Sequence, residues 1–255
     1  MPKANPPMTA ANPLWQNARD PIQLRPDEVH VWRVDLDADS DALRRSCETV
    51  SADEQARSEQ FYSLQDRDRY IIARGSLRAI LARYLGTPPR DLRFLSNAHG
   101  KPALEPDSSP ADLRFNVSHS HQLALLAFAQ CREVGIDVEY VLPYRADAHM
   151  AARFFAPQEV AALRALPETA RTEAFFRCWT RKEAYVKARG QGLSLPLNSF
   201  TVSLAPCPTI DLLTIGGDSP QAARWSLRAL APGEGYIAAV AAEGKDWSLI
   251  LWQGT

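Results

Sequence analysis

Large apolar side chains recur at helical spacing in two long segments of the chain. The first is DRDRYIIARGSLRAILARYLG, residues 66–86, in which Gly86 supplies a stop at the C-terminal end. The second is TEAFFRCWTRKEAYVKARG, residues 172–190, which ends in the same way at Gly190. The pattern predicts two long helices, each closed by a glycine.

Short apolar runs with strand character follow each predicted helix. The first set, Leu113 to Val117, Leu123 to Ala129 and Val134 to Tyr140, has the spacing of an antiparallel meander. RWSLRAL, YIAAVAA and DWSLILW repeat the arrangement around the turn-like APGEG. The helical segments begin 106 positions apart (66 and 172), and the middle runs 113 apart (123 and 236). Two similar α+β halves would produce this repeat, and so would two unrelated α+β units.

The expected division of the chain follows from these segments. We expect a loosely ordered N-terminal lead-in over 1–25, an N-terminal half over 26–135 and a C-terminal half over 136–255. Each half would be a long helix packed on a small antiparallel sheet. The cleft between such halves is the natural place for a ligand.

Composition excludes several classes of protein. A chain of 255 residues with a formal net charge of −1 can bury a sizeable core and has no general attraction for nucleic acid or an anionic membrane. The four cysteines show no metal-ligand spacing, which predicts a reducing, cytoplasmic setting. MPKANPPMTAANPLWQ lacks the apolar segment of a secretory signal, and no later run reaches membrane-spanning length.

Two segments place carboxylates where apolar side chains are expected. In the strand-like GIDVEY, Asp137 and Glu139 point to the same face, so their like charges must meet water or a cation. In FFRCWTRKEAYVK, Glu183 falls within an apolar stripe, with Lys187 one turn further. A solvated sheet face and an i,i+4 ion pair are the ordinary interpretations. The hypothesis we favour is that Asp137, Glu139 and Glu183 hold one magnesium ion, beside which Lys187 meets a phosphate.

Two further motifs lie near these carboxylates. Ser118 and His119 in NVSHS are unsuited to act as nucleophile and base, because adjacent strand residues point apart. His119 could instead donate a hydrogen bond to a phosphate, although a surface histidine is the commoner interpretation. NAHGKP predicts a tight turn in which Gly100 allows a special backbone conformation.

These motifs, NVSHS, GIDVE and FFRCWTRKEAYVKARGQGLSLPLNSF, together resemble the 4′-phosphopantetheinyl transferase superfamily in its larger, Sfp-type branch. The resemblance covers roughly residues 45 to 205. It implies an α+β fold whose two halves form a pseudo-dimer. It also implies a magnesium-dependent transfer of the phosphopantetheine arm of coenzyme A to a serine of a carrier protein, with release of 3′,5′-adenosine bisphosphate.

The resemblance assigns roles to individual residues. Asp137, Glu139 and Glu183 would bind magnesium, and Lys187 would contact the phosphates. The residues implied to contact coenzyme A, besides Lys187, are Arg57, Arg69, Gly100, Lys101, Pro102, Ser118 and His119. In this assignment Glu183, Lys187 and His119 are catalytic, and Arg57 and Arg69 hold the 3′-phosphate. Glu54 is a departure, because some relatives carry a lysine there.

The residue types suit the chemistry. Attack of a serine oxygen on the β-phosphate builds negative charge, which magnesium, Lys187 and His119 can stabilise. Glu183, directly or through a metal-bound water, is the expected base, with Glu159 as the alternative. A metal-dependent nuclease and an inert coenzyme A-binding module are the competing classes. We expect a monomer that binds its acyl or peptidyl carrier transiently.

Overall fold

The computed structural model describes residues 15–254 except 38, 107–111, 208, 211 and 216–218. The helices are α1 (Ser40–Thr49), α2 (Ala52–Ser58), α3 (Leu64–Leu85), α4 (Ala148–Phe154), α5 (Pro157–Ala165), α6 (Glu168–Arg189) and α7 (Ser219–Ala222). The strands are β1 (Gln16–Asn17), β2 (Glu28–Asp35), β3 (Phe94–Ser96), β4 (Pro102–Leu104), β5 (Leu113–Ser120), β6 (Leu123–Gln130), β7 (Val134–Tyr140), β8 (Phe200–Val202), β9 (Thr209–Ile210), β10 (Leu212–Ile215), β11 (Trp225–Leu230), β12 (Tyr236–Glu243) and β13 (Ser248–Gln253). The α+β prediction is confirmed.

Both predicted long helices form, and both end at the predicted glycines. α3 and α6 are each 22 residues long. Gly86 and Gly190 follow them with φ of 66° and 62°, the left-handed conformation that glycine adopts without a Cβ clash. Among the helices of the described part of the chain, none is long and apolar enough to cross a membrane.

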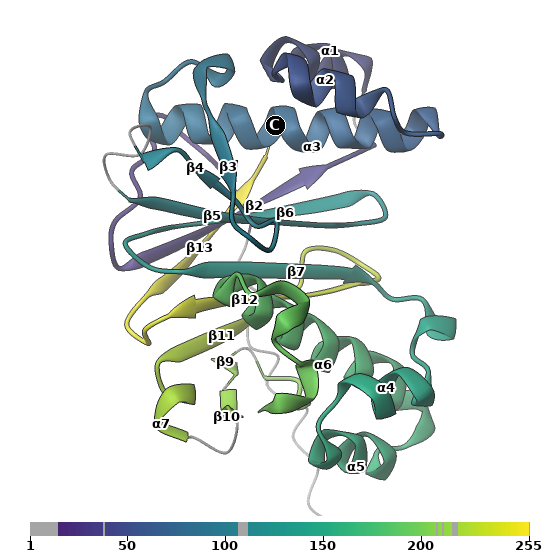
Figure 1. The fold of residues 1–255 in the computed structure, drawn as a ribbon. Helices are drawn as coiled ribbons and strands as arrows, with labels where there is room; N and C mark the ends of the chain where they lie inside the picture. The colour runs from purple at the N-terminus through teal and green to yellow at the C-terminus, as the bar shows by residue number, and fades with distance from the viewer. Residues whose placement is uncertain are drawn as a thin grey trace, which may run out of the picture.

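The elements stack in four layers (Figure 1). α3 covers the outer face of a five-stranded sheet with the order β1-β13-β2-β6-β5. The inner face of that sheet meets a four-stranded sheet with the order β7-β12-β11-β9. α6 covers the outer face of this second sheet, with α4 and α5 beside it (Figure 1). β6 is covered on both faces, which explains why LALLAFA is continuously apolar.

The third strand of each predicted meander pairs in the other sheet, so this part of the prediction is wrong. β7 follows β5 and β6 in the chain but pairs with β12 in the second sheet. β13 pairs in parallel with β2 in the first sheet, so that sheet is mixed and not purely antiparallel. The reason is β2, a strand that the sequence analysis did not identify. It pairs with β6 on the side away from β5 and leaves no edge for β7.

The two halves share a buried ion pair at matching positions. Glu54 is the third residue of α2 and pairs with Arg78, the fifteenth of α3. Glu159 is the third residue of α5 and pairs with Lys182, the fifteenth of α6. The basic side chains, Arg78 and Lys182, also each donate to two backbone carbonyl groups in the segment after the helix. This repetition is finer evidence for similar halves than the periodicity of the sequence.

The expected lead-in over 1–25 is described only from residue 15. Gln16–Asn17 form β1 against β13, and Ile22 and Leu24 are buried beneath α3. The expected boundary between 135 and 136 falls inside β7.

Candidate functional site

The predicted carboxylates lie where the edges of the two sheets meet. β5 is an edge strand of the first sheet and β7 is an edge strand of the second. Ser118 on β5 donates a hydrogen bond to Asp137 on β7 at 3.0 Å, and Ser120 donates to Glu139 at 3.0 Å. Asp137 and Glu139 therefore project from alternate positions of β7 toward β5, as strand periodicity predicts.

Lys187 connects α6 to the place where β5 and β7 meet, which we call the seam. Its Nζ lies 2.6 Å from Asp137 Oδ1 and donates to Ser118 Oγ at 2.9 Å. Lys187 is thus paired with the sheet, which rules out the simple solvated ion pair with Glu183. Asp137 is buried, and its second oxygen, Oδ2, has no hydrogen-bond partner in the part of the chain that the structure describes.

Three carboxyl groups share this region. Burial raises the pKa of Glu183, and the charges of Asp137 and Glu139 raise it further, while Lys187 acts in the opposite direction. Burial and the charge of Asp137 also raise the pKa of Glu139. Burial raises the pKa of Asp137 against the effect of Lys187. Asp137 and Glu139 thus lie close enough to Glu183 for their charges to act on it, and their joint role in holding a metal stays a prediction.

Gly135 allows α6 to lie close to β7. A Cβ placed on Gly135 would lie 2.2 Å from the backbone oxygen of Ala184 and 2.2 Å from the nitrogen of Ala188. The helix backbone therefore packs directly on β7. Glu183 directly precedes Ala184, and Lys187 directly precedes Ala188. The close packing at these two alanines therefore brings both side chains to the seam.

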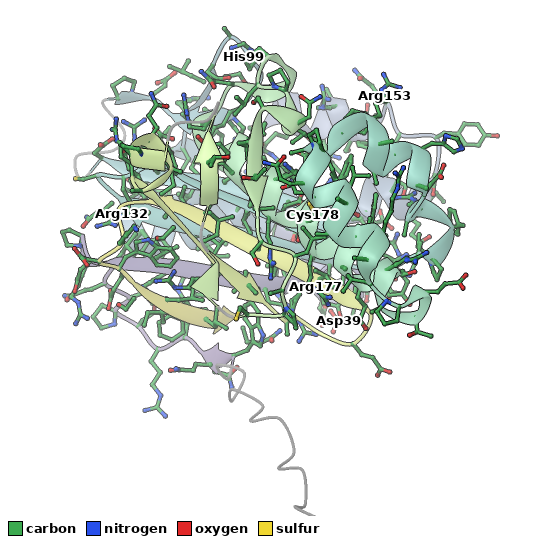
Figure 2. All side chains as sticks on the ribbon, turned by 90° about the horizontal axis from the view of Figure 1, so that it is seen from below. Asp39, His99, Arg132, Arg153, Arg177 and Cys178 are labelled. Carbon is green, nitrogen blue, oxygen red and sulfur yellow. The ribbon has the colours of Figure 1, made fainter. Side chains whose placement is uncertain are left out.

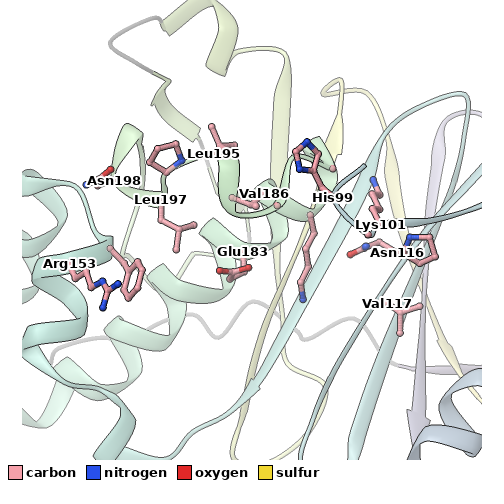
Figure 3. Close-up of a pocket in the computed structure, with 17 residues that line it drawn as sticks. His99, Lys101, Asn116, Val117, Arg153, Glu183, Val186, Leu195, Leu197 and Asn198 are labelled. Atoms are coloured by element: carbon pink, nitrogen blue, oxygen red, sulfur yellow. The ribbon is translucent and has the colours of Figure 1, made fainter. Parts of the chain in front are cut away.

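A cavity of about 510 Å³ opens on this part of α6. Glu183 and Val186 lie near its centre (Figure 3), and Lys187 also lines it. His99, Lys101 and Asn116 lie on one side of Glu183, and Leu195, Leu197 and Arg153 lie on the other (Figure 3). Gly100, Pro102, Val117, Phe154, Gly190, Gly192, Pro196 and Asn198 complete the lining. His99 and Arg153 lie toward the same edge of the molecule when it is viewed from below (Figure 2).

A second cavity, of about 410 Å³, lies against Glu139. Tyr144 and Met150 border it and are exposed, at 76% and 36% of their surface. The other lining residues are Arg145, Asp147, Phe175, Phe176 and Trp179. The first cavity thus borders Glu183 and the second, with four aromatic residues in its lining, borders Glu139.

The NAHGKP turn is as predicted, but Lys101 is engaged inside the protein. Gly100 has φ of 82°, and the side chain of Asn97 accepts from the backbone nitrogens of His99 and Lys101. Lys101 Nζ donates to Glu133 and to the backbone oxygens of Val134 and Ala188. Its ammonium therefore fastens the turn to β7 and to the end of α6, while Gly100 and Pro102 face the cavity.

Four of the predicted coenzyme A contacts lie outside the described lining of this cavity. Arg57 is exposed on α2. Arg69 on α3 pairs with Asp37, which also accepts from the side chain of Gln122 in the turn after β5. His119 is exposed on β5 and Ser118 is buried, so their side chains point apart as expected.

Glu54 and Glu159 are structural groups. Glu54 accepts from the backbone of Ser51 and pairs with Arg74 and Arg78, so the departure from the family pattern anchors α2 on α3. Glu159 is 2% exposed and pairs with Lys182, and its oxygens also accept from two backbone nitrogens. Glu159 is therefore held inside the protein and is absent from the described lining of both cavities, which argues against it as the base.

The chemistry of the donor set fits a hard divalent cation. Asp137, Glu139 and Glu183 offer only oxygen ligands, and the unpaired Oδ2 of Asp137 is a buried acceptor that lacks a donor. Within the described ranges, no three His, Cys, Asp or Glu side chains are already arranged to hold a metal ion. Binding would therefore require a side chain such as that of Glu183 to turn toward the other two.

Family models match most of the chain. The model described as "4'-phosphopantetheinyl transferase superfamily" matches residues 133–241, and "4'-phosphopantetheinyl transferase, N-terminal" matches residues 37–131. The 4′-phosphopantetheinyl transferase HetI of Nostoc sp. is 40% identical over 231 residues, which are 91% of this chain and 94% of that protein. The chain belongs to the 4′-phosphopantetheinyl transferase superfamily.

Two more distant members of the superfamily align over part of the chain. The transferase Sfp of Bacillus subtilis is 34% identical over 155 residues, which are 61% of this chain and 66% of that protein. The human L-aminoadipate-semialdehyde dehydrogenase-phosphopantetheinyl transferase is 31% identical over 166 residues, which are 62% of this chain and 54% of that protein.

The sequence analysis missed residues that shape the site without being charged. Ser120 and Asn116 bind β7, Gly135 admits α6, and Leu195 and Leu197 line the cavity. A signal for the first two was present, since N-x-S-x-S places polar side chains on one face of a strand. The lining leucines carry no such signal, because they follow the helix in an irregular segment.

Proposed function

We propose that this protein transfers the 4′-phosphopantetheine group of coenzyme A to a serine of an apo carrier protein. In the reaction the serine oxygen bonds to the β-phosphorus, the bond from that phosphorus to the bridging oxygen breaks, and 3′,5′-adenosine bisphosphate leaves. Family membership supports the reaction class. The observation that carries it for this chain is that Glu183 and Lys187 line a cavity of about 510 Å³ while Lys187 pairs with the buried Asp137.

The lining of the cavity suggests how coenzyme A lies in it. The turn at Gly100 and Pro102 would hold the adenine, as in the family pattern, and Lys187 would meet the pyrophosphate. The apolar end at Leu195 and Leu197 suits the largely uncharged pantetheine arm. Arg57, Arg69 and His119 are proposed phosphate contacts, which would require coenzyme A to extend beyond the cavity over β5 and α3.

We include magnesium in the proposal, with Asp137, Glu139 and Glu183 as the groups that would hold it. A bound divalent cation supplies charge stabilisation to a phosphoryl group under attack. Burial raises the pKa of all three carboxyl groups, and neighbouring carboxylates add to the effect at Glu139 and Glu183, so a cation bound among them would favour their charged forms.

Glu183 is the proposed general base. It lies at the centre of the cavity, and its raised pKa improves its affinity for the proton that the serine hydroxyl loses. The side chain of Lys187 would stabilise the charge that develops on the phosphate oxygens.

The second cavity is the proposed entry for the carrier. Coenzyme A and the serine must reach the same phosphorus, and this second cavity also borders the carboxylate cluster, through Glu139. The exposed Tyr144 and Met150 would contact apolar side chains of the carrier near its serine.

We propose that residues 26–135 and 136–255 are related halves in a pseudo-dimer and that the protein acts as a monomer. The matching ion pairs of Glu54 with Arg78 and of Glu159 with Lys182 support the relation between halves. A cytoplasmic location is also proposed. The structure describes all four cysteines and places none in a disulfide.

The test compares two glutamate-to-glutamine substitutions on α6. Glu183→Gln should abolish transfer to an apo carrier while leaving the fold intact. Glu173→Gln is the matched control, because Glu173 is an exposed residue of α6 whose ion pair, with Arg177, runs along the same helix. Equal rates for the two variants would refute the role of Glu183.

A further inference from the structure

β5 and β7 are joined by a regular set of side-chain hydrogen bonds. Asn116, Ser118 and Ser120 occupy alternate positions of β5, and their side-chain oxygens accept from the backbone nitrogens of Ile136, Val138 and Tyr140. These N–H···O distances are 2.9, 3.3 and 3.0 Å. The two strands run parallel at this seam, and the serine oxygens take the place that strand carbonyls would have in a sheet.

The two serines do more than bind the backbone. Ser118 Oγ accepts from Val138 N and donates to Asp137, while Ser120 Oγ accepts from Tyr140 N and donates to Glu139. Each hydroxyl thus fixes a carboxylate and the amide of the residue that follows it. This pairing sets the rotation of both carboxylates relative to the strand.

Ser118 has no capacity left for a ligand. A serine hydroxyl offers one donor and two acceptor positions. Ser118 donates to Asp137 and accepts from Val138 N and Lys187 Nζ. The residue is also only 6% exposed. A direct contact with coenzyme A would have to displace one of these partners, which is why a role through Asp137 and Lys187 fits better.

We propose that Ser118 and Ser120 are positioning residues that orient Asp137, Glu139 and Lys187 for the metal and the phosphate. The inference rests on the proposed function and replaces the expected contact of Ser118 with coenzyme A. Asn116 differs from the serines, because it accepts from Ile136 N, and the residue before Ile136 is Gly135, which has no carboxylate to orient.

The experiment uses Ser118→Ala and Ser120→Ala, with Ser118→Thr as the variant that keeps a hydroxyl. Ser226→Ala is the control, because Ser226 is a buried serine of the second sheet that donates to the backbone oxygen of Gly244. Binding of Mn²⁺, as a probe for magnesium, is measured by calorimetry on the free protein. Thermal unfolding and the KM for coenzyme A are measured for the same set.

The alanine variants should bind Mn²⁺ about tenfold or more weakly, as is usual when a group that orients a metal ligand is removed. At a fixed magnesium concentration the alanine variants should have a lower kcat, while their KM for coenzyme A should change little. Ser118→Thr should recover part of the lost Mn²⁺ affinity and kcat. Ser226→Ala should keep wild-type metal binding. If Ser118→Ala does not fold, the half-buried Ser120 gives the same comparison.

Two results would overturn the proposal. One is wild-type Mn²⁺ affinity in both alanine variants with a raised KM for coenzyme A, which would make Ser118 a direct ligand. The other is an equal loss of metal binding in Ser226→Ala, which would show a general effect on stability. Failure of the wild-type protein to modify any carrier would instead refute the proposed function. The Mn²⁺ affinities of the variants would still test whether Ser118 and Ser120 orient the metal ligands.

Discussion

Replacing Gly135 by alanine tests whether the close packing of α6 on β7 assembles the site. The added Cβ would lie 2.2 Å from the oxygen of Ala184 and from the nitrogen of Ala188, whereas ordinary contact begins near 3.4 Å. The helix must therefore retreat by about 1.2 Å, the difference between these distances. Because both opposing atoms are helix backbone, no side chain can rotate away. Overpacking of this kind costs about 1–3 kcal/mol of unfolding free energy.

The same displacement acts on the chemistry. Lys187 Nζ lies 2.6 Å from Asp137 Oδ1, so a retreat of α6 would break this contact and carry Glu183 away from the seam. A misplacement of about 1 Å costs on the order of 10²-fold in rate. We therefore expect Gly135→Ala to lower both stability, measured by urea unfolding, and the steady-state rate of carrier modification.

Gly86→Ala is the matched control. Gly86 has φ of 66° with nothing within 4 Å of an added Cβ, so the substitution strains the backbone by about 1–2 kcal/mol without crowding the site. It should lower stability and leave the rate nearly unchanged. A Gly135→Ala protein with the wild-type rate would refute the idea that this contact positions Glu183 and Lys187.

Three further predictions concern charge and docking. The pKa of Glu183 is raised in the folded protein, chiefly by burial and then by Asp137, so the folded state loses stability as pH rises through that pKa. Without divalent metal, Glu183→Gln should therefore raise the Tm more at about pH 7 than at about pH 4, and an equal shift at both would contradict this cause. Lys182→Met should cost about 3–5 kcal/mol in urea unfolding by leaving Glu159 buried and unpaired, and a cost below about 1 kcal/mol would argue against that pair. Tyr144→Ala should raise the KM for the carrier but not for coenzyme A, whereas an effect on coenzyme A alone would place the carrier elsewhere.

Local patterns predicted the elements that carry the site. The long helices were identified because their apolar periodicity is strong and each ends at a glycine, Gly86 or Gly190. The alternation in GIDVEY correctly put Asp137 and Glu139 on one face, and the apolar surroundings of Glu183 correctly marked it as unusual.

Strand pairing could not be predicted in the same way. Whether β7 pairs with β6 or β12 depends on which edge is free, and β2 decides that from almost 100 positions earlier in the chain. The hydrogen-bond partners of individual polar side chains could not be predicted from the sequence either. Nothing in the spacing of NAHGKP indicates that Lys101 points into the protein, or that Ser118 has three partners.

The most direct test of the account is the mass of an apo carrier protein after incubation with this protein, coenzyme A and magnesium. The account predicts a gain of one phosphopantetheine group on a serine, equal release of 3′,5′-adenosine bisphosphate, and loss of both when a chelator is added or when Glu183→Gln replaces the wild-type chain. An unmodified carrier across fatty-acid, polyketide and peptide types, despite measurable binding of coenzyme A, would contradict it.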